Sequence, residues 1–300
     1  MLRVLLTNDD GIEAEGLQAL RRALVGLRDI DLAVIAPDGN RSATARSITF
    51  GRPLWVSEVP FGDGTHGFAC DGTPVDCVRM AALGLIDGFE PDVVVSGINH
   101  GSNLGDDITY SGTVAAALEA IVLGLPGIAV SQQSMAREMD FRLGERFDFE
   151  AAAAFTARLV DRLEDVPLPE GTLLNVNVPA GEPKGLRFAR LGHRVYSDKI
   201  VEHVDPRGRT HYWIGTGEPT WEALEGTDMG AVHDGFVAVT PLHLDLTNHR
   251  ALAVMGHWPA ALDGQLRRAA ARPAAPDGPA HAGAPAAAAR PGARKRARRR

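Results

Sequence analysis

Short apolar runs alternate with helical patterns through the first half of the chain, and this alternation constrains the fold more than any other feature. The runs span residues 3–6, 31–36, 92–95 and 127–130, and the first three are followed within two residues by Gly, Pro or Asn. Such runs are typical of buried parallel strands. Strands that alternate with helices predict an α/β fold with a doubly wound, mostly parallel sheet.

The segments between these strands carry apolar residues at helical spacing. Leu17, Leu20 and Leu24 repeat in this way, and so does the stretch 114–122. A further helix is predicted over 147–163 and a strand over 173–178, before Pro179. Beyond these, a hairpin is predicted around the Pro/Gly turn at 205–208, within an added arm of about 192–235, and a strand over 236–242 returns to the body.

Composition divides the chain near residue 258, so we predict one domain over 1–258 and a disordered basic tail over 259–300. The tail is rich in Ala, Pro, Gly and Arg, and such a segment buries too little apolar surface to offset its ordering entropy. Residues 271–300 carry seven Arg and one Lys against one Asp, which is a net charge of +7. The whole chain has a net charge of −7, so the remaining residues, the body of the chain, carry −14. The tail is either a solvated appendage or a weak electrostatic contact for RNA.

The acidic body argues against duplex nucleic acid as the main partner and favours a carboxylate site filled by a cation. Two cysteines, Cys70 and Cys77, make neither a disulfide framework nor a four-ligand zinc site. No stretch resembles a signal peptide or a membrane span. We therefore expect a cytoplasmic protein without membrane contact.

The first predicted strand ends in two adjacent carboxylates, in the turn Thr7-Asn8-Asp9-Asp10-Gly11. Ligands of open α/β sheets bind beyond the carboxyl ends of the strands. Two crowded carboxylates repel unless a cation lies between them, and Mg²⁺ or Mn²⁺ suits oxygen ligands. Alternatively, Asn8 and Asp9 only shape an Asx turn and cap the next helix.

Polar loops also follow the second and third strands. The second is followed by a loop with Arg41, Ser42 and Thr44, and the third by a Gly-rich loop with Asn99 and Asn103. Ser111-Gly112-Thr113 then begins a helix, where free N–H groups favour a phosphate, although an ordinary Ser/Thr cap gives the same pattern. The chain lacks a Gly-x-x-x-x-Gly-Lys-Ser/Thr loop and a Gly-x-Gly-x-x-Gly after the first strand, which disfavours ATPases and dehydrogenases.

Together these motifs resemble the SurE nucleotidases, the stationary-phase survival proteins. The resemblance spans about residues 1–247, and its motifs occur in the order of that family: Leu6-Thr7-Asn8-Asp9-Asp10-Gly11-Ile12, Ala36-Pro37 to Arg41-Ser42-Ala43-Thr44, Gly72-Thr73-Pro74-Val75-Asp76-Cys77, Ser96-Gly97-Ile98-Asn99 to Ser111-Gly112-Thr113, and Val239-Thr240-Pro241-Leu242. One departure is His100 between Asn99 and Gly101, where the family often has Arg.

The resemblance implies a Rossmann-like core and one divalent cation held by four protein ligands: Asp9, Asp10, Ser42 and Asn99. It also implies hydrolysis of nucleoside 5′- and 3′-monophosphates, and dimers or tetramers built through the carboxyl-terminal arm. We expect the cation to activate a water, with Asp9 or Asp10 holding that water or accepting its proton. Phosphate contacts are expected from Asn103, Ser111, Gly112 and Thr113.

Two alternatives stay open at this stage. His100 either protonates the leaving alkoxide or is an ordinary surface histidine. The whole chain is either this phosphatase or a non-catalytic nucleotide sensor that regulates a stress response. Phosphate release from nucleoside monophosphates, with and without a chelator, separates the enzyme from the sensor.

Overall fold

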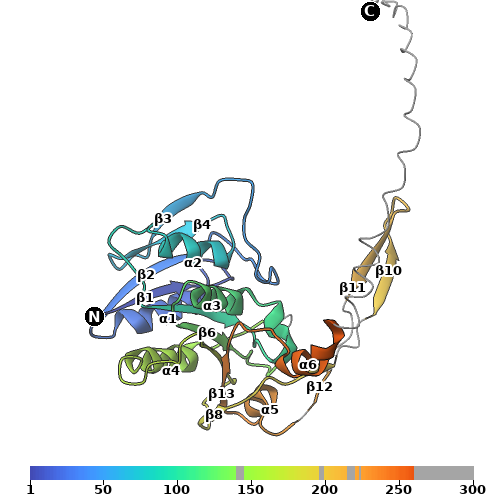
Figure 1. Ribbon diagram of the computed structural model, residues 1–300. Coiled ribbons are helices and arrows are strands. Elements are labelled where there is room, and N and C mark those ends of the chain that lie inside the picture. The colour runs from blue at the N-terminus through green and yellow to red at the C-terminus, as the bar shows by residue number, and fades with distance from the viewer. Residues whose placement is uncertain (140–144, 196–198, 215–219, 223, 260–300) are drawn as a thin grey trace, which may run out of the picture. The chain divides into compact units, whose positions relative to one another are not determined.

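The computed structural model describes residues 1–139, 145–195, 199–214, 220–222 and 224–259. Its main feature is a nine-stranded sheet of order β3-β4-β2-β1-β5-β6-β7-β13-β8 (Figure 1). The strands are β1 (Leu2–Thr7), β2 (Ile30–Pro37), β3 (Val56–Pro60), β4 (His66–Cys70), β5 (Val93–His100), β6 (Gly127–Gln132), β7 (Leu173–Val178), β8 (Leu186–Phe188) and β13 (Val237–Leu242).

Most neighbouring strands of this sheet are parallel. The central run from β4 through β2, β1, β5 and β6 to β7 is parallel throughout. The antiparallel pairs are β3 with β4 and β13 with β7, both towards the edges. The doubly wound, mostly parallel sheet predicted from the sequence is therefore confirmed.

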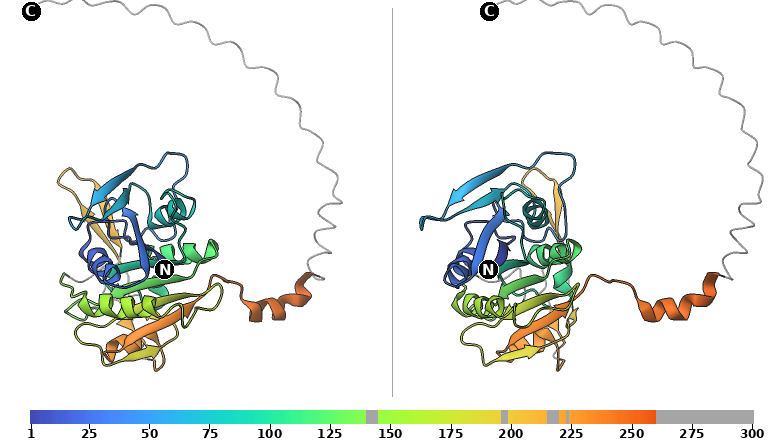
Figure 2. Two further views of the ribbon diagram at one scale, coloured as in Figure 1. Left: turned by 90° about the vertical axis from the view of Figure 1, so that its left-hand side faces the viewer. Right: turned by 60° about the vertical axis from the view of Figure 1, so that its left-hand side comes forward.

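Helices cover both faces of the sheet (Figure 2). Helices α1 (Glu15–Val25) and α4 (Glu150–Asp161) contact each other on one face, and α2 (Pro74–Ala82) and α3 (Gly112–Val122) contact each other on the other. Successive strand residues point to opposite faces, so Val4 and Leu6 pack with the α1 side whereas Leu5 packs with the α2–α3 side.

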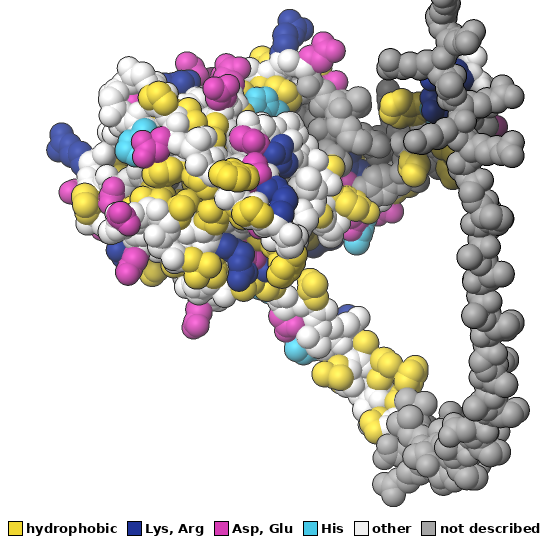
Figure 3. Space-filling view, turned by 90° about the horizontal axis from the view of Figure 1, so that it is seen from above, with side chains coloured by type: hydrophobic (Ala, Val, Ile, Leu, Met, Phe, Trp, Pro, Cys, Tyr) yellow, Lys and Arg dark blue, Asp and Glu magenta, His cyan; other side chains and the backbone are white. Residues whose placement is uncertain are grey.

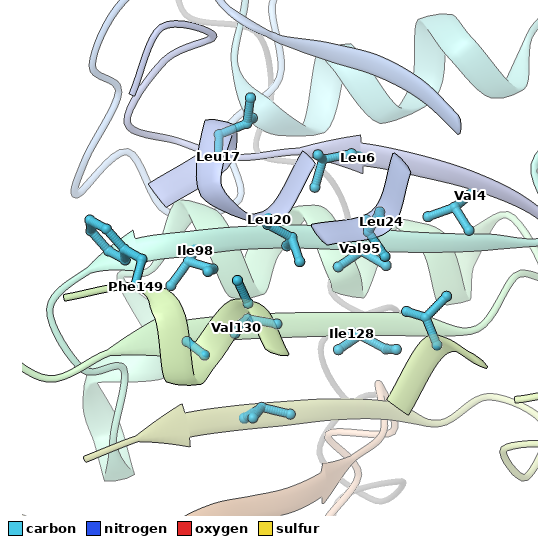
Figure 4. Packing of buried hydrophobic residues seen from close by; sticks show 14 of the residues in the cluster. Val4, Leu6, Leu17, Leu20, Leu24, Val95, Ile98, Ile128, Val130 and Phe149 are labelled. Atoms are coloured by element: carbon cyan, nitrogen blue, oxygen red, sulfur yellow. The ribbon is translucent and has the colours of Figure 1, made fainter. Parts of the chain in front are cut away.

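The larger core lies under α1. Leu17, Leu20 and Leu24 of this helix are fully buried, and they face strand residues such as Val95 and Ile128 (Figure 4). Their spacing of three and four residues puts them on one stripe of the helix. The leucines that form the apolar pattern in the sequence are thus the residues that pack α1 onto the sheet.

The element boundaries differ from the predicted ones mainly at the ends. The helix predicted over 147–163 runs over Glu150–Asp161, and the strand predicted over 173–178 is found as expected. The antiparallel pair β3 and β4 was not predicted, because β3 is largely exposed and β4, although mostly buried, carries no clear apolar run. The third strand continues to His100 rather than ending at Val95.

Residues beyond β8 include the predicted arm. The hairpin consists of β10 (Ile200–Val204) and β11 (Thr210–Ile214), which pair antiparallel as predicted. β9 (Arg194–Val195) pairs with β12 (Thr220–Trp221), and α5 (Asp228–His233) precedes β13.

The chain divides into two compact units, Met1–Asp245 and Leu246–Arg300. The second contains α6 (His249–Val254) and η2 (Met255–His257). The predicted basic tail and its RNA contact lie, from residue 260 on, outside the described residues.

The surface of the first unit carries mixed charge. On the face seen in Figure 3, basic and acidic side chains are interspersed and do not form a single basic area. Among the described residues, no helix is long and apolar enough to cross a bilayer.

A β-bulge-like irregularity in β5 determines the position of the last residues of this strand. The register against β6 shifts between Ser96 and Asn99, and Gly97 has a φ of +136°. A Cβ at Gly97 would lie 2.4 Å from the carbonyl oxygen of Val130. Only glycine fits here, because the backbone is in a region that L side chains avoid and has no space for a methyl group.

We predict that Gly97→Ala lowers the free energy of unfolding by about 3 kcal/mol, through strain and a backbone clash. Urea unfolding followed by circular dichroism measures this change. The control is Gly26→Ala, since Gly26 has a φ of −74° and its nearest neighbouring atom would lie 3.5 Å from the new Cβ. A loss of similar size in both variants would contradict the role of the irregularity.

Candidate metal and phosphate site

The candidate site lies where the sheet changes winding direction. β1 has β2 on one side and β5 on the other, so the chain leaves β1 in one direction and later returns on the opposite side. At such a point the loops that follow the two strands separate and leave a crevice for a ligand. Asp9 and Asp10 follow β1, and Asn99 and His100 end β5.

The turn after β1 is shaped by Asn8. Its Oδ1 accepts the N–H of Gly11 at 3.1 Å, and its Nδ2 donates to the Gly11 carbonyl at 2.9 Å. Asn8 therefore shapes the turn through its side chain, as considered for the sequence, although the bond spans three residues and not the two of an Asx turn. The helix-cap role is absent, because the first turn of α1 follows Ala14, which makes no side-chain cap.

Asp9 is buried beneath the first turn of α3. Its Oδ1 accepts a hydrogen bond of 2.5 Å from the hydroxyl of Thr113. A Cβ at Gly112 would lie 2.7 Å from Asp9 Oδ2, so the carboxylate packs directly on the glycine. Burial, followed by the nearby charge of Asp10, raises the pKa of Asp9 above its usual range. A cation between the two carboxylates would relieve both effects.

Asp10 is held by His100. Its Oδ2 lies 2.9 Å from His100 Nδ1 and accepts the His100 backbone N–H at 3.2 Å. The imidazole packs edge-on against Phe147 and Phe149, with ring centroids 5.2 and 4.8 Å away. His100 is therefore a packed partner of Asp10 and not an ordinary surface histidine.

Three of the four expected metal ligands line one small cavity. Asp9, Ser42 and Asn99 surround a volume of about 30 Å³, which also touches His100, Asn103, Tyr110 and Ser111. Asp10 lines the adjoining open cavity of about 830 Å³, and His100 lines both. The Asn99 Nδ2 donates to the Gly101 carbonyl at 2.8 Å, so Asn99 Oδ1 is the atom left to bind a ligand.

The expected phosphate contacts come from the start of α3 and from the loop after β5. Ser111 is the N-cap of α3, and its hydroxyl accepts the Val114 N–H at 3.1 Å, so it serves as the ordinary cap considered above. The hydroxyl of Thr113 is engaged by Asp9. At Gly112 and Thr113 the groups available to an anion are therefore backbone N–H groups of the first helical turn.

Asn103 is held by residues that the sequence motifs did not single out. Asn177 accepts the Asn103 N–H at 2.8 Å and donates to its carbonyl at 2.9 Å, while Asn175 donates to the same carbonyl. The Asn103 side chain donates to Ser131 at 2.8 Å. The sequence did hold one sign of these residues, since the otherwise apolar strand Leu-Leu-Asn-Val-Asn-Val contains two asparagines. Asparagine is rarely buried without hydrogen-bond partners.

Comparison with known proteins identifies relatives of this chain. A family described as "Survival protein SurE" matches residues 4–198. A protein named 5′-nucleotidase SurE from Rubrobacter xylanophilus is 53% identical over 86% of this chain and 97% of its own length. A protein of the same name from Geobacter sulfurreducens is 48% identical, over 86% and 94%.

A solved structure is also similar. The crystal structure of the SurE protein from Aquifex aeolicus superposes with a TM-score of 0.71 at 40% identity, and the match covers 85% of this chain and 99% of that one. The fold, the order of the motifs and these relatives agree, and the chain belongs to the SurE family.

Proposed function

We propose that the chain is a 5′-nucleotidase, a phosphomonoesterase that cleaves nucleoside 5′- and 3′-monophosphates to nucleoside and phosphate. One observation carries the proposal: a cavity where Asp9, Ser42 and Asn99 offer oxygen ligands lies directly before the first turn of α3. A cation and an anion can therefore be bound side by side. The name shared by the relatives supports the nucleotide as the substrate.

The residues present fit a hard divalent cation. Asp9, Asp10, Ser42 and Asn99 offer two carboxylates, a hydroxyl and an amide oxygen, and we assign them as its ligands. The fixed Asn99 amide supports this assignment, because its nitrogen is bound to Gly101 and its oxygen is left for the ligand. When bound, Mg²⁺ or Mn²⁺ supplies Lewis-acid polarisation of the phosphoryl group and lowers the pKa of a bound water.

The remaining roles belong to the chain itself. Asp10 is fixed through one oxygen by His100, so its second oxygen is the one that would contact the cation and hold the attacking water beside it. The N–H groups of Gly112 and Thr113, and the second N–H of the Asn103 amide, whose first donates to Ser131, stabilise negative charge on the phosphoryl oxygens. Both catalytic carboxylates are held by neighbours, which limits the reorganisation needed during the reaction.

The arm is the proposed site of subunit contact. Ile200 and Ile214 are register partners at the open end of the hairpin, and they are 70% and 77% exposed. Tyr212 and Trp213 on the same hairpin are 60% and 61% exposed. Apolar side chains so exposed on one small element favour burial against a second copy of the chain, in a dimer or a tetramer.

Removal of the metal is the first test. We expect EDTA to abolish phosphate release from nucleoside monophosphates and Mn²⁺ or Mg²⁺ to restore it. Asp10→Asn should lower kcat by a factor of about 10²–10³ with the metal supplied, since it removes a charged group needed at the reacting centre. Asp161→Asn, at an exposed carboxylate of α4, is the control. Nucleotide binding without turnover in the wild type would support the sensor instead.

The packing of Asp9 on Gly112 gives a second prediction. Gly112→Ala places a methyl group against the carboxylate, and we expect kcat/KM to fall about a hundredfold because Asp9 moves. Circular dichroism at the assay temperature checks that the variant is folded, because the new Cβ would also lie 2.7 Å from the Asp9 Cβ and so would lower stability. Full activity in this variant would show that the position of Asp9 does not matter.

The arm can be tested without any substrate. We expect Ile200→Ser combined with Ile214→Ser to convert the assembly to a monomer, measured by light scattering after size exclusion. Circular dichroism checks that the sheet is retained. An unchanged molar mass would rule out the hairpin as the subunit contact.

A further inference from the structure

The loop that carries Ser42 is tied to the helix that holds Asp9 by one buried carboxylate. Glu119 of α3 has a side chain only 2% exposed, and two arginines contact it. Arg46, from the Ser42 loop, lies 2.7 Å from Glu119 Oε2, and Arg79, from α2, lies 2.5 Å from Oε1. The two arginines are similarly exposed, at 37% and 43%.

The loop needs anchors because its backbone is strained beside Ser42. Ala43 and Ala45 both have positive φ values, 59° and 51°, in the left-handed region that residues other than glycine rarely occupy. Such conformations persist where the surroundings hold them in place. Arg46, next in the chain, makes a charged contact to the buried Glu119, and Ala45 N–H donates to the Tyr110 carbonyl.

Glu119 belongs to the helix that forms the other half of the site. Thr113, in the first turn of α3, holds the Asp9 carboxylate. The pair Arg46–Glu119 therefore connects the Ser42 loop to Asp9 through one rigid helix, in addition to the direct bond from the Arg41 N–H to the Asp9 carbonyl at 2.6 Å. Arg79 neutralises the same carboxylate but belongs to α2 and not to the loop.

We propose that Arg46 is a positioning residue, which sets Ser42 relative to Asp9 through Glu119 and so tunes the affinity for the divalent cation. This inference rests on the proposed function, because it takes Ser42 as a metal ligand. Residues that orient the ligands of a metal commonly change its affinity by a factor of about 10–100 when they are replaced.

The experiment compares two variants of the full chain, Arg46→Met and Arg79→Met. Each removes one of two similarly exposed arginines, and each leaves Glu119 with one cationic partner. We expect Arg46→Met to raise the Kd for Mn²⁺, measured by isothermal titration calorimetry, about tenfold. Arg79→Met should stay within about twofold of the wild type, and Arg46→Lys should recover part of the loss.

Hydrogen exchange provides a readout without metal. Amides over residues 42–47 should exchange faster in Arg46→Met than in the wild type or in Arg79→Met. Equal Mn²⁺ affinities in Arg46→Met and the wild type, or an equal loss in both Met variants, would overturn the inference. If Arg46→Met does not fold, Arg46→Lys and Arg79→Lys make the same comparison.

The proposed function can fail separately. Wild-type protein that binds no Mn²⁺ would overturn the metal site and this inference together. Ser42→Ala with wild-type Mn²⁺ affinity would overturn Ser42 as a ligand, and with it the route from Arg46. If Ser42→Ala weakens Mn²⁺ binding and Arg46→Met does not, the metal site stands and only the inference about Arg46 is rejected.

Discussion

The burial of Asp9 at the carboxyl end of β1 is the constraint around which the site is built. Asp9 is almost unexposed and a second carboxylate follows it in sequence. A charged group in such a place costs free energy unless neighbours stabilise it. Thr113 donates to it, Gly112 leaves room for it, and the adjoining cavity offers oxygens to a cation. These neighbours come from the first turn of α3, the Ser42 loop and the end of β5, so the position of Asp9 depends on the whole sheet edge.

Helix α3 is the element that these contacts share. Its first turn contacts Asp9 and presents free N–H groups, while Glu119, two turns later, binds the arginine of the Ser42 loop. Its buried residues also form part of the core on that face of the sheet. A helix fixed by apolar packing is rigid, and polar groups mounted on it keep their separation. Binding geometry and fold stability are therefore linked in one element.

The sequence predicted the chemistry more fully than the geometry. Apolar runs located the strand ends, where ligands bind, and the resemblance to the SurE family then assigned Asp9, Asp10, Ser42 and Asn99 as the metal ligands. Asn177 and Glu119 could not be named, because a polar residue within an apolar run gives no sign of what it contacts. The strand extension to His100 was also missed, since the glycine at position 97 resembles a strand terminator until its register against β6 is known.

The sequence by itself determined the alternation of strands and helices, the turn shaped by Asn8, and the oxygen-rich character of the loops, because these depend on local spacing and residue type. Only the tertiary structure decided that the Thr113 hydroxyl donates to Asp9, that His100 holds Asp10, and that Arg46 and Arg79 share Glu119. These contacts join residues 40 to 104 positions apart, and partners at such separations are selected by the packing of the sheet and its helices, which local patterns do not encode.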